Sequence, residues 1–124
     1  MIKNQVHSKF KVFIPEASLT DEEAMRRLAS MVEGWARASK VAIKSVGIEY
    51  IDALKQVVLS LGYRDDEPGY PVKLTSISLG KLGLRPDEIG TAMEEAAKNT
   101  ENVICHEFFV DEKGEYVMVL LSHG

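Results

Sequence analysis

The first third of the chain contains one strand pattern and one helix pattern. Apolar and polar residues alternate over residues 9–14, with Phe10, Val12 and Ile14 on one face, and this period predicts a half-buried strand. Thr20 followed by three acidic residues has the form of a capping box, so a helix is predicted to begin there. The apolar stripe of this helix recurs at spacings of three and four and comprises Met25, Leu28, Ala29, Val32 and Ala36.

A hairpin and then a linker are predicted after this helix. Residues 41–51 and 56–64 alternate in polarity and contain many β-branched side chains, which predicts two strands with a turn at residues 52–55. Residues 64–71 contain one arginine, three acidic residues, two prolines and one glycine. This composition predicts an irregular, acidic connection between the two halves of the chain.

The second half repeats the order of the first. A strand is predicted over residues 72–79, and a helix is predicted to begin near Pro86 because proline and acidic residues favour the first turn. Two strands over residues 103–110 and 115–122 follow, joined by a turn in which Gly114 can adopt a positive φ. The apolar stripe of this second helix comprises Ile89, Ala92, Met93 and Ala96.

The last strand is apolar on both faces. Three apolar side chains of one face alternate with three of the other over residues 116–121. A strand that helices cover on one side only does not need both sets, so something else must cover its second face. We therefore expect either a homodimer that associates through this sheet face or an internal barrel.

The two halves, about residues 8–64 and 70–123, each have the order strand, helix, strand, strand, which predicts a single α+β domain over residues 1–124. Aligning Asp52 with Asp111 (111 − 52 = 59) places the alternating apolar residues of the two returning strands in register. An ancient duplication is one explanation, and an accident of short apolar strands is another. The expected architecture is an antiparallel sheet with both helices on one face.

This βαββ-βαββ order resembles the ferredoxin-like fold in its tandem form and is similar to the dimeric α/β-barrel proteins. The resemblance is one of element order over nearly the whole chain, and it identifies no specific family. It implies a choice among cofactor-free monooxygenases, haem-degrading enzymes, decarboxylases and plain ligand binders, among which a fold does not decide.

Composition and charge restrict the functional class. The chain has 124 residues, 45% of them hydrophobic, which suits one core, and its net charge of −4 disfavours nucleic acid as a partner. No apolar run is long enough to span a membrane, and residues 1–9 lack the apolar core of a secretion signal. With the single cysteine Cys105 unable to form an internal disulfide, we expect a soluble, cytoplasmic protein.

The candidate catalytic residues are His106, Glu49 and Tyr50. His106 and Glu107 combine an imidazole with a carboxylate, but neighbours in a strand point to opposite faces, which favours a structural role for both. The expected hairpin pairing places His106 on the face of Val117 and Val119, the face that needs another cover. Glu49 in the first hairpin needs a cationic partner, for which Arg64 and Lys44 are candidates.

The candidate ligand-binding residues are Ser60, Arg64 and Tyr70. Ser60 and Thr75 are strand hydroxyls that can line a cleft, although such groups more often bond to nearby backbone. Residues 64–70 either form a solvated linker, which is favoured, or a lid over a barrel mouth.

No metal and no cofactor are expected. His7, Cys105, His106 and His123 lack the paired spacing of a zinc site, and the chain has no phosphate-binding or dinucleotide-binding glycine motif. Three functions follow as hypotheses, and the last of them is an accessory subunit of a larger complex. The first is a non-enzymatic, self-associating domain that binds a small molecule or a protein partner. The second is a cofactor-free enzyme that acts on a hydrophobic small molecule in a barrel cavity, for which an internal cavity is the discriminating feature.

Overall fold

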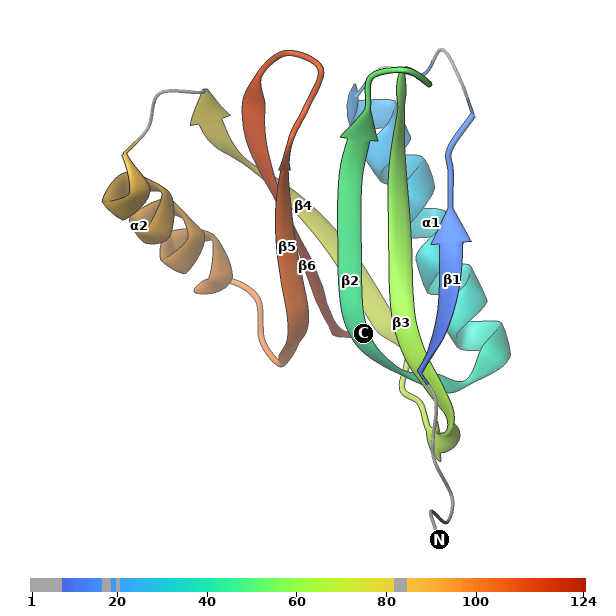
Figure 1. The fold of residues 1–124 in the computed structure, drawn as a ribbon. Coiled ribbons are helices and arrows are strands. Elements are labelled where there is room, and N and C mark those ends of the chain that lie inside the picture. The colour runs from blue at the N-terminus through green and yellow to red at the C-terminus, as the bar shows by residue number, and fades with distance from the viewer. Residues whose placement is uncertain (1–7, 17–18, 20, 82–84) are drawn as a thin grey trace, which may run out of the picture.

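The computed structural model describes residues 8–16, 19, 21–81 and 85–124, so the capping residue Thr20 and His7 lie outside the described residues. The α+β class and the predicted order of elements are confirmed (Figure 1). Along the chain the elements are β1 (Lys9–Phe13), α1 (Asp21–Ser39), β2 (Val41–Ile51), β3 (Gln56–Pro68), β4 (Val72–Lys81), α2 (Pro86–Ala97), β5 (Val103–Val110) and β6 (Glu115–His123).

The strands form two antiparallel sheets of three. Sheet A has the order β1-β3-β2, and sheet B has the order β4-β6-β5, so both halves have the same internal topology. The edge strands β2 and β5 run side by side, as Figure 1 shows, but no ladder of the described residues joins them. The single antiparallel sheet that we expected is therefore not formed.

Helix α1 packs against both sheets and forms the main core with them. Its stripe residues Leu28 and Val32 are fully buried in one cluster with Leu59 of sheet A and with Val119 and Leu121 of sheet B. The helix also lies against the edge strand β4. The predicted apolar stripe is thereby confirmed, and α1 is the element through which the two halves share a core.

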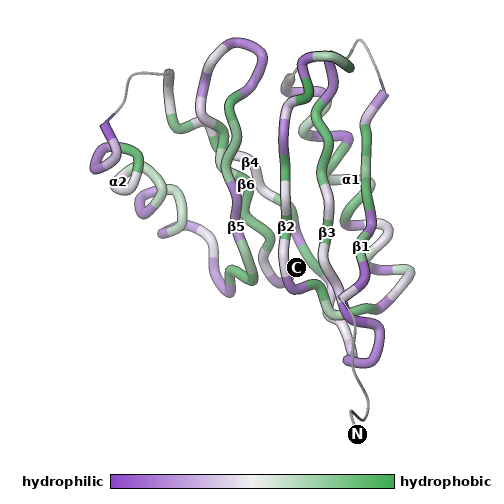
Figure 2. The backbone as a smooth tube through the Cα atoms, viewed as in Figure 1, coloured by the Kyte–Doolittle hydropathy of each residue, from purple (hydrophilic) through white to green (hydrophobic). Residues whose placement is uncertain are grey.

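Strand β6 is buried on both faces by different parts of the same chain. Val119 and Leu121 face the main core, whereas Met118 and Leu120 belong to a smaller cluster beneath α2. The two helices consequently lie on opposite faces of sheet B. The prediction that both lie on one face is therefore wrong. Hydrophobic stretches run along the strands of both sheets, while the β5–β6 turn is hydrophilic (Figure 2).

This internal cover changes the argument for self-association. The second face of β6 was expected to need a partner molecule, yet the first half of the chain supplies that cover, since Val119 and Leu121 are both 0% exposed. This cover comes from α1 and sheet A of the same chain, and the described strands form two separate sheets and not the internal barrel that was the alternative to a homodimer. The homodimer stays a prediction, but it now needs a different surface.

Strand β1 presents the opposite face to the core from the one expected. Phe13 is buried and packs edge-on against Trp35 of α1, with ring centroids 5.9 Å apart. Phe10, Val12 and Ile14 are exposed on the face of sheet A turned away from α1, here called the far face, and Phe10 is 70% exposed. Alternation identified the two faces correctly, but the position of α1 determined which one is covered.

The β5–β6 hairpin has a register that differs from the expected one. Asp111 N–H donates to the carbonyl oxygen of Glu115 at 2.9 Å, and Gly114 adopts a φ of 79°. The turn thus closes one residue later than expected, and a shift of one residue exchanges the faces of a strand. His106 accordingly pairs with Leu120 on the α2 side and not with Val119, so its predicted face is wrong.

The acidic segment after residue 64 is also more regular than predicted. Strand β3 continues to Pro68, and Ala42 of β2 still pairs with Arg64. Gly69 N–H then donates to the carbonyl oxygen of Lys40 at 3.1 Å, which ends the strand. Residues 65–67 have no partner in the ladder between Arg64 and Pro68, and Glu67 forms an ion pair with Lys44 of β2. The connection between the halves is therefore limited to the residues just before β4.

Candidate functional site

The candidate residues of β2 and β3 are divided between the two faces of sheet A. Glu49 pairs with Val58 and is exposed on the far face. Tyr50 pairs with Val57 on the opposite face and packs against the main core. Ser60 is half-buried on the far face with Glu49. Glu49 and Tyr50 therefore do not converge on one site.

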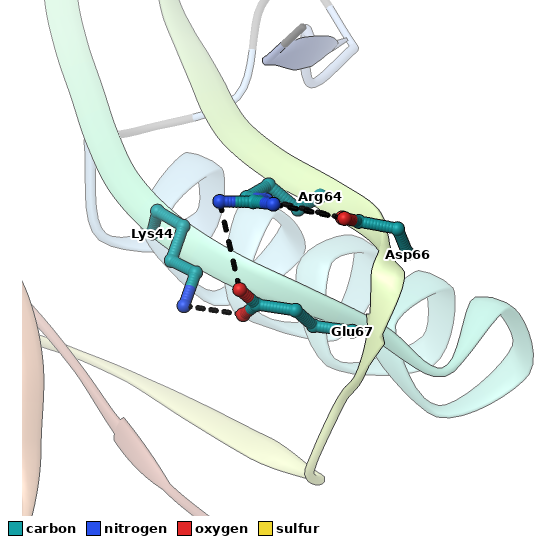
Figure 3. A network of polar contacts seen from close by, with 4 residues as sticks. All are labelled: Lys44, Arg64, Asp66 and Glu67. Atoms are coloured by element: carbon teal, nitrogen blue, oxygen red, sulfur yellow. Dashed lines mark hydrogen bonds and ion pairs between the residues drawn. The ribbon is translucent and has the colours of Figure 1, made fainter. Parts of the chain in front are cut away.

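Arg64 belongs to a surface ion-pair network at the end of β3 (Figure 3). Its guanidinium donates to both carboxylate oxygens of Asp66, at 3.0 and 2.8 Å, and lies 3.6 Å from Glu67. Lys44 of β2 pairs with Glu67 at 2.7 Å. The hydrogen bond from Arg64 lowers the pKa of the Asp66 carboxyl. Both cations proposed as partners for Glu49 are thus paired with other carboxylates, and the network holds the extended end of β3.

Tyr70 lies away from the other two predicted ligand-binding residues. Its side chain is exposed, and its ring is tilted against that of His123, with centroids 5.1 Å apart. Ser60 is on the far face of sheet A, and Arg64 is at the end of β3. Ser60 and Arg64 lie on the same face of β3, four residues apart, and Tyr70 follows the end of that strand with a contact of its own.

His106 and Cys105 lie on opposite faces of β5. His106 is exposed on the α2 side of β5, and Glu107 lies on the opposite face, as predicted for neighbours in a strand. Cys105 pairs with Leu121 and packs against the main core, and burial raises the pKa of its thiol to about 11. A thiol that keeps its proton is a poor nucleophile.

The raised pKa of Cys105 predicts a loss of stability at alkaline pH. Its pKa rises from 9.0 when unfolded to about 11 when folded, so between these values the unfolded state alone releases the proton. The free energy of unfolding should therefore fall as pH rises from 9 to 11. Urea unfolding of the wild type and of Cys105→Ala measures this, because lysines and tyrosines titrate in both proteins. A stability difference between them that is constant with pH would contradict the prediction.

A groove between α1 and β4 is the best candidate for a binding site. It is open on one side and has a volume of about 900 Å³, within the usual range of small-ligand sites. Its walls are the first turns of α1, the length of β4, and the β5–β6 turn with the start of β6. The lining residues are Glu22, Glu23, Met25, Arg26, Ala29, Lys73, Leu74, Thr75, Ser76, Ile77, Ser78, Asp111, Lys113, Glu115 and Val117.

The groove runs along the free edge of sheet B. Leu74 N–H donates to a carboxylate oxygen of Glu33 on α1 at 3.0 Å, so this amide points away from β6. Amide directions alternate along an antiparallel edge strand, and Leu74, Ser76 and Ser78 pair with every second residue of β6. The backbone groups of Ser76 and Ser78 therefore also point outward, into the groove. Glu33 satisfies the first of three edge amides and leaves the next two to a ligand or to water.

Charges of both signs surround an apolar floor. Met25, Ala29 and Val117 contribute apolar surface. Arg26, Lys73 and Lys113 bring three cations, none of which forms an ion pair with any residue in the described part of the chain. Carboxylates come from Glu22, Glu23, Asp111 and Glu115.

One of these carboxylates has a structural role. An oxygen of Asp111 accepts from the backbone N–H groups of Lys113 and Glu115, at 2.9 Å each. It therefore holds the β5–β6 turn that forms one end of the groove. The other carboxylates extend from α1 and from the first residue of β6, so cationic and anionic groups of a ligand can each find a partner.

A second hollow lies on the other side of β4. It has a volume of about 510 Å³ and lies between this strand and the end of α2, where Asn99 and Asn102 contribute to its lining. Lys73, Thr75 and Ile77 line both hollows. Thr75, one of the two strand hydroxyls considered from the sequence, thus faces a cleft, whereas Ser60 lines neither of these two hollows.

The groove could not be found by reading the sequence. Its walls come from residues 22–29, 73–78 and 111–117, which no motif connects. The only local signal was the run of hydroxyl residues Thr75, Ser76 and Ser78 in a predicted strand, of which Thr75 alone was singled out.

Two further features are absent from the described residues. They contain no group of three or more His, Cys, Asp and Glu side chains that could hold a metal ion. No helix among them is both long enough and apolar enough to cross a membrane. Comparison with protein-family models, curated proteins and solved structures found no match to the chain.

Proposed function

We propose that the protein is a non-enzymatic binding domain that takes a small zwitterionic molecule with an apolar body, such as an amino acid or a dipeptide, in the α1–β4 groove. The observation that carries the proposal is the unpaired edge of β4 inside a hollow of ligand size. An edge strand supplies amide donors and carbonyl acceptors at fixed spacing, which match the backbone groups of such a ligand.

The charges of the groove support the same class of ligand. Arg26 and Lys73 can pair with the carboxylate of a ligand, and Glu22 and Glu115 can pair with its ammonium group. Met25 and Val117 offer apolar contact for a side chain. A molecule of a single charge would leave one set of groove charges unmatched, which disfavours simple anions and simple amines.

Binding without catalysis is favoured over the hypothesis of a cofactor-free enzyme. None of His106, Glu49 and Tyr50 lines the groove. The face of sheet B on which a barrel cavity was expected is filled by buried side chains of the main core, among them Val119, Leu121 and Phe109. Buried side chains thus occupy the position of the expected cavity, and the expected acid-base residues do not line the groove.

A thermal-shift panel tests the proposal. We expect some amino acids or dipeptides to raise the melting temperature by several degrees, because a ligand at 100 times its Kd stabilises a protein by about 2.7 kcal/mol. Organic anions and amines of similar size form the comparison arms. The proposal fails if no member of the panel shifts the melting temperature, or if the shifts do not distinguish zwitterions from the comparison arms.

Two tryptophan variants locate the binding. Ser76→Trp places a large ring in the groove and should abolish the thermal shift. Ala38→Trp, at an exposed position near the other end of α1, should retain it. Equal shifts in both variants would place the ligand elsewhere on the molecule.

A further inference from the structure

Among the described residues, two apolar surfaces are exposed, and they belong to different halves. The first is the far face of sheet A, where Phe10 and Val12 are exposed on the edge strand β1, with Ile14 exposed just beyond the end of the strand. The second is the α2 side of β5, where Phe108 is 40% exposed and Val110 is exposed beside it. Exposed apolar rows on sheets usually mark sites of association.

The contact between the two halves shows how such surfaces pack. In the first half, α1 lies on sheet A and also covers the face of sheet B that carries Leu74, Val119 and Leu121. In the second half, α2 has the corresponding position on sheet B. None of the residues of α2 is buried, so its outer side remains available. Helix α2 thus packs against one sheet, whereas α1, the corresponding helix of the first half, packs against two.

The strand pairing identifies the surface that would supply this second sheet. Phe10 pairs with Gly62, and Leu74 pairs with Leu121. Leu121 follows Gly62 by 59 residues (121 − 62 = 59), the same offset that separates Asp52 from Asp111. Phe10 therefore corresponds to Leu74. Leu74 is 6% exposed because α1 covers it, whereas Phe10 is exposed. The face that is covered in sheet B is uncovered in sheet A.

We infer that copies of this chain associate head to tail, with α2 and the outer side of β5 of one copy on the far face of sheet A of the next. This contact repeats between molecules the packing that the two halves already make within one molecule. It joins two different patches, so each copy has one patch of each kind. Such heterologous contacts close into rings or extend into chains.

The sizes of the side chains are complementary across the inferred contact. Ser60 and Gly62 of the far face occupy the places that Val119 and Leu121 have in sheet B, so this floor is lower. Cross-strand packing keeps it low, because a Cβ on Gly62 would lie within 2.3 Å of Ser45 Oγ. On the docking side, Phe108 pairs with Met118 in sheet B as Ile48 pairs with Leu59 in sheet A, so the two residues occupy corresponding positions. Phe108 is the larger of the two. A larger projection therefore meets a deeper floor.

The two surfaces are independent of the α1–β4 groove, since none of Phe10, Val12, Ile14, Phe108 and Val110 lines it. Loss of association therefore does not predict loss of ligand binding, and the two proposals can fail separately. The inferred contact also differs from the homodimer expected from the sequence, which would have used the face of β6 that α1 covers.

A mixing experiment tests the inference. Light scattering of the wild type over a concentration series should give a mass above the 13.8 kDa of one chain. Phe10→Asp and Phe108→Asp should each give a single-chain mass, because each removes one patch. Mixed in equal amounts, the two variants should form a species of twice that mass, since each retains the patch that the other has lost. Leu54→Asp, at an exposed apolar position in the β2–β3 turn, should keep the wild-type mass.

The other outcomes overturn the inference. These are a monomeric wild type, association that survives either substitution, and a mixture that stays monomeric. Dissociation by only one of the two substitutions would indicate a symmetric contact between identical patches, which also contradicts it. Circular dichroism checks that the variants fold, and Val12→Lys and Val110→Lys provide a second pair at neighbouring exposed positions.

Discussion

Replacing Leu121 with alanine is expected to lower the free energy of unfolding by about 2–5 kcal/mol. Leu121 is completely buried on β6, between Leu74 of β4 and Cys105 of β5, in the cluster that α1 forms with both sheets. The substitution removes apolar surface from this core and leaves a cavity that the two sheets and the helix cannot all close. Urea unfolding followed by circular dichroism measures the effect.

Leu120→Ala provides a matched comparison on the same strand. Leu120 is also buried, but it faces α2, a short helix with no buried residue of its own. Because α2 can move toward the sheet, the cavity can collapse, and the loss should lie near the low end of the same range. Leu54→Ala, in the exposed β2–β3 turn, should change stability by less than about 0.5 kcal/mol. If Leu121→Ala cost no more than Leu54→Ala, the shared core of the two halves would be wrong.

Replacing Gly69 with alanine is expected to lower the free energy of unfolding by about 2–4 kcal/mol. A Cβ at this position would lie 1.8 Å from the carbonyl oxygen of Val41 and 2.9 Å from the carbonyl carbon of Lys40. These are backbone atoms, so no side chain can move aside. Relief requires β3 to separate from the start of β2 and to lose the Gly69–Lys40 hydrogen bond. Thermal and urea unfolding measure the loss.

Gly34→Ala is the control for this prediction. Gly34 is exposed on α1, and a Cβ there would meet no atom within 4 Å. Alanine has a higher helix propensity than glycine by about 1 kcal/mol, so this variant should be more stable than the wild type. A mild effect of Gly69→Ala, similar in size to that of Gly34→Ala, would contradict the close approach of β3 and β2 at this turn.

The candidate residues show how far reasoning from single residues can reach. His106, Glu49 and Tyr50 were chosen for their chemistry, and Ser60, Arg64 and Tyr70 for their places in strands and in the connection. The ion pairs of Arg64 and the ring contact of Tyr70 place them in surface contacts away from the groove. The groove itself is made of ordinary residues whose proximity depends on how α1 lies along β4. A site without a motif has no signal in a single sequence.

The elements, their order and the buried stripe of α1 could be predicted from the sequence, because they follow from interactions between residues a few positions apart. The sequence also indicated that β6 is buried on both sides, since each of its faces is apolar. Only the tertiary structure decided what covers each face. Alternation shows that a strand has two faces, but the packing of distant elements selects the one that is buried.

The register of the β5–β6 hairpin was likewise decided by structure, through one extra residue in the turn at Gly114. The division into two sheets arises because the edge strands β2 and β5 lie in contact without a common ladder, and no local pattern encodes this. The groove, the shared core and the two uncovered surfaces all follow from these non-local contacts. These features cannot be predicted from periodicity, because periodicity is a property of a segment, whereas burial is a property of the folded chain as a whole.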